Sequence, residues 1–242
     1  MKAPYLIIEA GEPVSSLRRH GSFSHWIRHS AGLPMDRGVA CRVTRGEALP
    51  ASFEGFAGVI VSGSASMVTE KLDWSEASAE WLRGAREAGL PLFGICYGHQ
   101  LLAHAFGGTV GDNPKGREIG SVDIDCLPAA ADDALFGELP ASFRAQVSHL
   151  QTVLQPPSEA VILASSEKDD CQAFRLGTHV WGVQFHPEFS STITRGYVRA
   201  RKGRIGAEGM DAAAILAGVG AAPLARRVLR RFVHVADTML AN

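Results

Sequence analysis

The sequence has 242 residues, of which 46% are hydrophobic and 20% charged, and its formal net charge is −1. These values are ordinary for a globular protein with a sizeable core, and they exclude a largely disordered chain. Basic residues are scattered apart from four arginines between 226 and 231, whose helical spacing indicates a solvated helix face, so no nucleic-acid partner is expected.

Strands and helices alternate through the first half of the chain. Because the strands are apolar on both faces and are separated by helices, they indicate a parallel sheet covered on both sides. The expected strands span residues 5–8, 39–43, 58–61 and 92–95, and the expected helices span 23–29, 75–88 and 99–106.

The second half has more strands and shorter connections. Strands are expected at 119–127, 145–148, 160–164, 171–176 and 180–185, and the last three lie close enough together to pair antiparallel. Residues 203–222 are rich in Gly and Ala and give no clear assignment, whereas 224–240 predicts a terminal helix. The fold class is therefore α/β, with a mostly parallel central sheet flanked by helices and a smaller antiparallel portion. No repeat or linker appears, so one domain over 1–242 is expected.

The chain shows no sign of a membrane span or a secretion signal. No apolar stretch approaches the roughly 18 residues that a span requires, and the first apolar run is short and broken by Glu9 and Gly11. The four cysteines are far apart and form no CxxC pair. We therefore expect reduced thiols, a cytoplasmic location, and neither a metal nor a cofactor.

One cysteine stands at a sharp turn between a buried strand and a helix. Cys96 has glycine two residues before it and two after it, at positions 94 and 98. Only the smallest residues fit beside a side chain held out at such a turn, as in the nucleophile elbow of serine hydrolases. The following helix N-terminus favours the thiolate, which is the attacking species. Cys96 is the candidate nucleophile.

A histidine and a carboxylate follow the last predicted strand. In an extended chain, side chains two residues apart point to the same face, so His186 and Glu188 are expected to project together. Pro187 favours that extended geometry at His186. A carboxylate beside an imidazole selects its tautomer and stabilises the imidazolium, so these residues are the candidate base and its orienting partner.

Acyl transfer through a tetrahedral intermediate also requires N–H donors for the developing oxyanion. The elbow geometry assigns the amide of Tyr97 as one donor. The turn at 62–64, directly after the third strand, is the best candidate for the second, because Gly63 lets the backbone turn an N–H inward; an ordinary strand-ending turn is the alternative.

Together these segments resemble the class I glutamine amidotransferases, and most of all the glutaminase domain of GMP synthase and its stand-alone relatives. The resemblance covers about residues 5–200, and leaves 203–242 as a C-terminal helical extension. The matching stretches, in the order of the family, are Val61–Ser64, Gly94–Gln100, Ser148–His149 and Gly182–Glu188.

The resemblance implies a flavodoxin-like fold and a thioester mechanism with the triad Cys96, His186 and Glu188. It also implies oxyanion donors at Gly63 and Tyr97, and glutamine bound by Gln100, Leu150 and Gln151. Relatives often carry an acidic residue where Gln151 stands, which puts that contact in doubt.

Three functions stay open at this stage. The first is a glutaminase that passes ammonia to a separate synthetase or other acceptor chain, because the chain has no P-loop and no room for a second catalytic domain. The second is a γ-glutamyl peptide hydrolase with the same triad. The third is a regulatory protein that kept the fold without catalysis.

Overall fold

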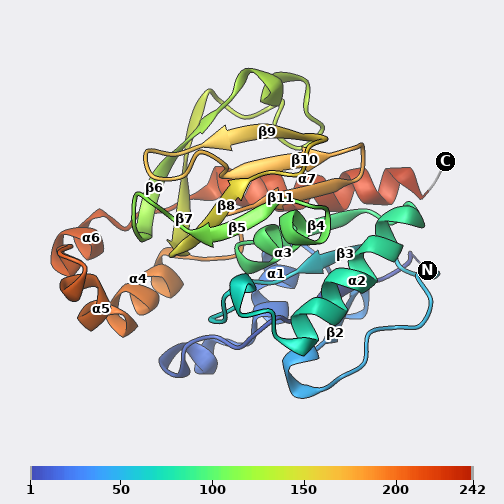
Figure 1. Ribbon diagram of the computed structural model, residues 1–242, viewed down its shortest axis with the longest axis horizontal. Coiled ribbons are helices and arrows are strands. Elements are labelled where there is room, and N and C mark those ends of the chain that lie inside the picture. The colour runs from blue at the N-terminus through green and yellow to red at the C-terminus, as the bar shows by residue number, and fades with distance from the viewer. Residues whose placement is uncertain (1, 241–242) are drawn as a thin grey trace.

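The computed structural model describes residues 2–240. A nine-stranded sheet runs through the molecule in the order β2-β1-β3-β4-β11-β10-β9-β6-β7, with helices on both faces (Figure 1). The strands are β1 Tyr5–Ile8, β2 Gly38–Cys41, β3 Gly58–Val61, β4 Leu92–Ile95, β5 Thr109–Asp112, β6 Glu118–Cys126, β7 Ser142–His149, β8 Gln151–Gln155, β9 Ala160–Ser165, β10 Ala173–Leu176 and β11 Val180–Val183. The α-helices are α1 Phe23–Ala31, α2 Asp73–Glu87, α3 Tyr97–Ala105, α4 Ser191–Ala200, α5 Lys202–Ala207, α6 Ala212–Gly218 and α7 Pro223–Met239.

The sheet changes its pairing along its width. From β2 to β11 the neighbours are parallel, and from β11 to β7 they are antiparallel. Short hairpins join β9, β10 and β11, so antiparallel pairing is the only arrangement that their connections allow. The predicted α/β class with an antiparallel portion in the second half is confirmed.

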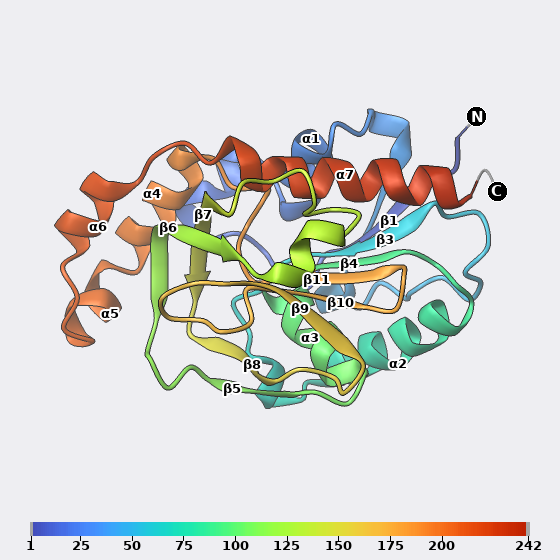
Figure 2. The same cartoon turned by 90° about the horizontal axis from the view of Figure 1, so that it is seen from above.

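Side chains of the central strands alternate between two cores. In β1, Tyr5 and Ile7 pack in a cluster with α1 and α7, whereas Leu6 and Ile8 pack in a second cluster with α2 and α3. Figure 2 shows these two pairs of helices on opposite sides of the sheet. Both faces of the strand are fully buried, which explains its unbroken apolar sequence.

The terminal helix α7 completes one of these cores. Phe232 is fully buried, and its ring centroid lies 5.0 Å from that of Phe93 and 6.2 Å from that of Trp181. The predicted helix is confirmed, but it is part of the central packing and not an appendage. Arg227 and Arg230 are exposed on its outer face, as the spacing of the arginines predicted.

Several boundaries differ from the predictions. Strand β2 ends at Cys41, and Val43 begins a 3-10 turn; α2 and α3 each begin two residues before the predicted start. Strands β5 and β8 were not predicted, and they form a separate two-stranded antiparallel sheet. The β5 sequence contains Gly111 and Asp112 and is largely exposed, so it lacks the apolar alternation of a strand.

The Gly- and Ala-rich stretch after residue 202 contains the short helices α5 and α6, which lie beside α4 at one end of the sheet (Figures 1 and 2). No single helix within residues 2–240 has the length and apolar character of a membrane span. Helices α6 and α7 reach that length only as a pair bent by 67°. The buried face of α7 packs on the sheet.

Candidate active site

Cys96 lies on a strained turn at the carboxyl edge of the sheet. Its φ of +52° and ψ of −100° place it among the few non-glycine residues with positive φ, a conformation that costs about 1–3 kcal/mol. A Cβ on Gly94 would lie 2.5 Å from the carbonyl carbon of Gly98, and a Cβ on Gly98 would overlap the backbone of Val61. The two flanking glycines are therefore required by close backbone approach, as the elbow interpretation predicted.

The sheet order places the base beside this nucleophile. Strands β4 and β11 are parallel neighbours, with Ile95 opposite Val183, and the Cys96 amide donates to the Val183 carbonyl at 2.8 Å. Both chains leave the sheet at the same edge, so Cys96 and His186 converge although they are far apart in sequence.

His186 and Glu188 form a buried pair, with 2.8 Å between Nδ1 and a carboxylate oxygen. Their predicted partnership is confirmed, but the predicted reason is wrong. Strand β11 ends at Val183, and Pro187 and Glu188 lie in a turn. The turn, not an extended strand, brings the two side chains together. Phe189 stacks on the imidazole with 3.9 Å between ring centroids.

The electrostatics of Cys96 and His186 are those of an ion pair. Burial raises the pKa of the Cys96 thiol, but the charge of His186 and a hydrogen bond with it outweigh burial, so the pKa lies below its ordinary value. Burial lowers the pKa of His186, whereas the charges of Glu188 and Cys96 raise it, to about 10. The favoured resting state is thiolate and imidazolium.

The two predicted oxyanion donors lie on either side of the thiol. A Cβ on Gly63 would lie 3.0 Å from Cε1 of His186 and 3.8 Å from Cβ of Cys96, so this loop borders both residues. Tyr97 is the first residue of α3, and the amides of the first helical turn have no partner within the helix. Their role as donors stays a prediction.

The residues predicted to bind substrate line the pocket that opens on Cys96. Gln100 donates from Nε2 to the Gln151 carbonyl at 2.7 Å. The Gln151 amide nitrogen donates to Thr69 and Asp112, at 2.7 and 3.1 Å, whereas its Oε1 is buried without a partner. Leu150 also lines the pocket, but its contact with substrate stays a prediction.

A second imidazole–carboxylate pair lies beside the thiol, and its partnership was missed. His149 was interpreted only as a pocket residue. Its Nε2 lies 3.0 Å from Glu118 and its Nδ1 lies 3.1 Å from the Gln151 carbonyl, so both nitrogens face acceptors and the ring is held as an imidazolium. Burial lowers the pKa of His149, but Glu118 and Asp169 raise it above its ordinary value. The tertiary structure alone brings Glu118 to this position.

Three arginines in the same pocket were also missed. Arg117, Arg201 and Arg204 line it together with Cys96 and Ser148. Arg117 lies in a segment that the sequence singled out only for its resemblance to relatives, and Arg201 and Arg204 lie at the edge of the stretch without an assignment. No local pattern points to an anion site at any of them.

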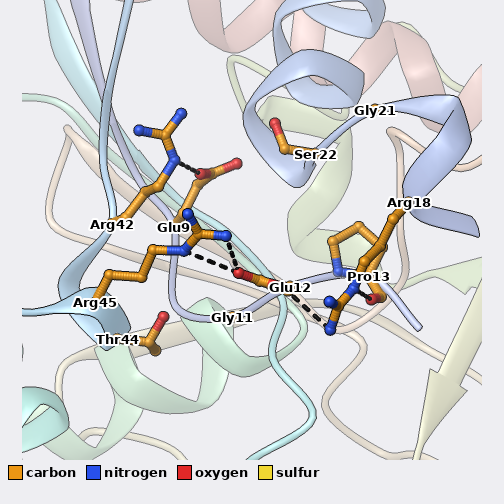
Figure 3. A pocket seen from close by; sticks show the side chains of 10 residues that line it. All are labelled: Glu9, Gly11, Glu12, Pro13, Arg18, Gly21, Ser22, Arg42, Thr44 and Arg45. Carbon is orange, nitrogen blue, oxygen red and sulfur yellow. Dashed lines mark hydrogen bonds and ion pairs between the residues drawn. The ribbon is translucent and has the colours of Figure 1, made fainter. Parts of the chain in front are cut away.

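A second hollow, of about 200 Å³, lies at the carboxyl ends of β1 and β2 (Figure 3). Its charged side chains bind one another: Arg42 pairs with Glu9 at 3.2 Å, and Arg18 and Arg45 both pair with Glu12. Because these charges are balanced internally, the hollow presents no free group for chemistry. Within residues 2–240, no three His, Cys, Asp or Glu side chains are grouped as a metal site requires.

Comparison with known proteins finds one family. Residues 19–202 match the family described as glutamine amidotransferase class-I. The chain is 39% identical over 147 residues to a GMP synthase [glutamine-hydrolyzing] of Aeropyrum pernix, which covers 61% of this chain and 26% of that protein. It thus spans about a quarter of the length of that relative.

Shorter relatives align over more of their length. A GMP synthase [glutamine-hydrolyzing] subunit of Ignicoccus hospitalis is 36% identical over 177 residues, covering 71% of this chain and 86% of that protein. Gamma-glutamyl peptidase 3 of Arabidopsis thaliana is 32% identical over 142 residues, 56% of each. A solved glutamine amidotransferase of Thermotoga maritima has the same fold, with a TM-score of 0.74 at 22% identity over 96% of this chain and 99% of that one.

Proposed function

Because this chain belongs to the class I glutamine amidotransferase family, we propose that it hydrolyses the side-chain amide of glutamine to glutamate and ammonia through a thioester on Cys96. The observation that carries the proposal is the convergence of a thiol on a strained turn with a buried imidazole–carboxylate pair 2.8 Å across. That arrangement supplies a nucleophile, a proton carrier and an orienting group.

The mechanism follows from the ion pair. The Cys96 thiolate attacks the γ-carbonyl carbon, and the carbonyl electrons move to oxygen, where the Gly63 and Tyr97 amides stabilise the oxyanion. The intermediate collapses, the carbon–nitrogen bond breaks, and the His186 imidazolium protonates the departing nitrogen. Neutral His186 then takes a proton from water, which attacks the thioester and releases glutamate. Glu188 keeps Nδ1 protonated throughout.

Substrate binding uses the polar groups of the pocket floor. The partnerless Oε1 of Gln151 accepts a hydrogen bond from the substrate α-ammonium, which gives this buried oxygen the partner that it lacks. Gln100 holds the Gln151 backbone in place, and the adjacent Leu150 backbone completes the contact. An uncharged amide thus replaces the acidic residue that relatives often carry.

The ammonia passes to an acceptor on a separate chain in this proposal. One relative is named as a subunit of GMP synthase, and the chain itself has no P-loop. Copurification from the native host, followed by glutaminase assay with and without the bound chain, tests this part.

Glutaminase assay of the purified chain and its variants tests the central claim. Cys96→Ala and His186→Ala are expected to abolish ammonia release while leaving the circular dichroism spectrum unchanged. Cys126→Ala is the matched control, because that half-buried thiol lies outside the pocket. Full activity in either active-site variant would overturn the mechanism, and inertness of the wild type toward all γ-glutamyl compounds would favour a regulatory protein.

A second candidate function is γ-glutamyl peptide hydrolysis with the same triad. The arginines that line the pocket favour it, since ammonia as a leaving group has no charge for them to bind. Turnover of glutamine compared with γ-glutamyl dipeptides separates the two functions.

A further inference from the structure

One arginine of the active-site pocket has no counter-charge. Arg201 stacks over Tyr197 with its Cζ 4.8 Å from the ring centroid, and its Nη1 donates to Ser148 Oγ at 2.8 Å. Within residues 2–240 no carboxylate lies in ion-pair range of its guanidinium. Burial, together with the charges of Arg117 and Arg204, holds its pKa below the ordinary value.

Its neighbour Arg117 shows what a satisfied arginine in this pocket looks like. The Arg117 side chain is 5% exposed and binds both carboxylate oxygens of Glu208, at 2.8 and 2.9 Å. Arg204 is exposed and, in the part of the chain that the structure describes, has no ion pair. The pocket thus holds two guanidinium groups, Arg201 and Arg204, whose charge is not balanced. A desolvated charge without a partner is costly unless a ligand supplies one.

A continuous stack of rings places Arg201 on the leaving-group side of Cys96. The His186 ring lies 3.9 Å from that of Phe189, and the Phe189 ring lies 4.9 Å from that of Tyr197. Arg201 covers the far face of this stack. His186 protonates the departing nitrogen in the proposed mechanism, so the groups that continue from His186 border the leaving amine.

We propose that Arg201 and Arg204 form a subsite for a carboxylate carried by the leaving amine, so that γ-glutamyl amino acids and peptides are substrates of this site. The inference rests on the proposed function, because it uses the same thioester chemistry. The carbon–nitrogen bond of the γ-glutamyl amide breaks, His186 protonates the amino acid that leaves, and water converts the thioester to glutamate and free thiol.

A matched pair of substrates isolates the carboxylate. γ-Glutamylglycine and γ-glutamylmethylamide share the acyl group and the secondary amide, but only the first has a carboxylate on the leaving amine. A charge-assisted hydrogen bond contributes enough to raise kcat/KM about 10- to 100-fold. The wild type is therefore expected to prefer γ-glutamylglycine by about that factor.

Two arginine variants and a control test the assignment. Arg201→Gln and Arg204→Gln are expected to lower the preference at least fivefold each, and Arg204 is exposed, so its variant keeps the fold. Arg199→Gln makes the same charge change at an exposed position of α4 outside the pocket, and its preference stays at the wild-type value. A wild type without preference, or a preference that survives both pocket variants, overturns the subsite.

Binding to Cys96→Ala separates this inference from the proposed function. Calorimetry with the two substrates reports the subsite whether or not catalysis occurs: tighter binding of γ-glutamylglycine, lost in Cys96→Ala/Arg201→Gln, supports it, and equal binding refutes it. Absence of all turnover in the wild type refutes only the proposed function. If the arginine variants instead weaken glutamine relative to 4-aminobutanamide, which lacks the α-carboxylate, the arginines bind the donor and the leaving-group assignment is wrong.

Discussion

Two buried imidazole–carboxylate pairs flank the same thiol, and they differ in which ring nitrogens are free. His186 uses Nδ1 for Glu188, which leaves Nε2 to exchange a proton with Cys96 and substrate. His149 uses Nε2 for Glu118 and Nδ1 for a backbone carbonyl. A general base needs an open nitrogen, so His186 carries protons, whereas His149 acts as a fixed positive charge.

The pairs also differ in how the chain makes them. His186 and Glu188 are two residues apart and meet through a local turn, whereas His149 and Glu118 lie opposite each other on the antiparallel strands β7 and β6. Glu118 also accepts from Ser166 at 2.7 Å and Gln172 at 2.6 Å. The first pair is therefore a catalytic device on one loop, and the second is a brace across several strands.

The largest expected effect comes from removing the proton carrier. His186→Gln should lower kcat about 10,000-fold, as loss of a triad member does in hydrolases, because glutamine cannot protonate the leaving nitrogen. Steady-state ammonia release measures it, and thermal unfolding should show a folded protein. A loss smaller than tenfold would assign proton transfer to another residue.

Breaking the brace should reduce stability. Glu118→Gln leaves His149 buried without its counter-charge and should lower the free energy of unfolding by about 3–5 kcal/mol. The pKa of Glu118 is lowered in the folded protein and that of His149 is raised. Glu118 therefore contributes fully above its ordinary pKa of 4.5, and His149 contributes fully below its ordinary pKa of 6.5.

Urea unfolding at several pH values checks this prediction. The loss in Glu118→Gln should be greatest between pH 4.5 and 6.5 and should shrink as the pH falls below or rises above that window. A loss that does not depend on pH would mean that packing, and not charge, explains the effect.

Removing both members of the brace should separate stability from electrostatics. Glu118→Gln/His149→Gln exchanges an ion pair for two neutral amides, so it should be more stable than Glu118→Gln alone. The positive charge of His149 lowers the pKa of Cys96, so the acidic limb of the kcat/KM profile should move about one unit to higher pH. Thiol alkylation against pH gives an independent reading, and an unmoved profile would contradict the role of His149.

The smallest effect concerns the ring that holds the proton carrier. Phe189→Leu removes the stack on His186, which contributes about 0.5–1.5 kcal/mol, so kcat should fall about 3- to 10-fold. Activity at saturating glutamine is the measurement. If the variant matches the wild type, the turn alone positions His186.

Much of the site could be predicted because its chemistry is local. The elbow at Cys96 is written in two glycines whose absent side chains make room for backbone, and His-Pro-Glu places base and carboxylate on one short turn. Alternation of apolar runs and helical patterns likewise determined the α/β class. The detail of the turn could not be predicted, because a proline next to a strand end permits both continuation and reversal.

The tertiary structure alone decided what surrounds the thiol. Parallel pairing of β4 with β11 placed Cys96 beside His186, and pairing of β6 with β7 placed Glu118 on His149. The return of the chain after α4 brought Arg201 into the pocket. These contacts join residues far apart in sequence, and their energies depend on burial and on opposing charges that only the folded chain creates.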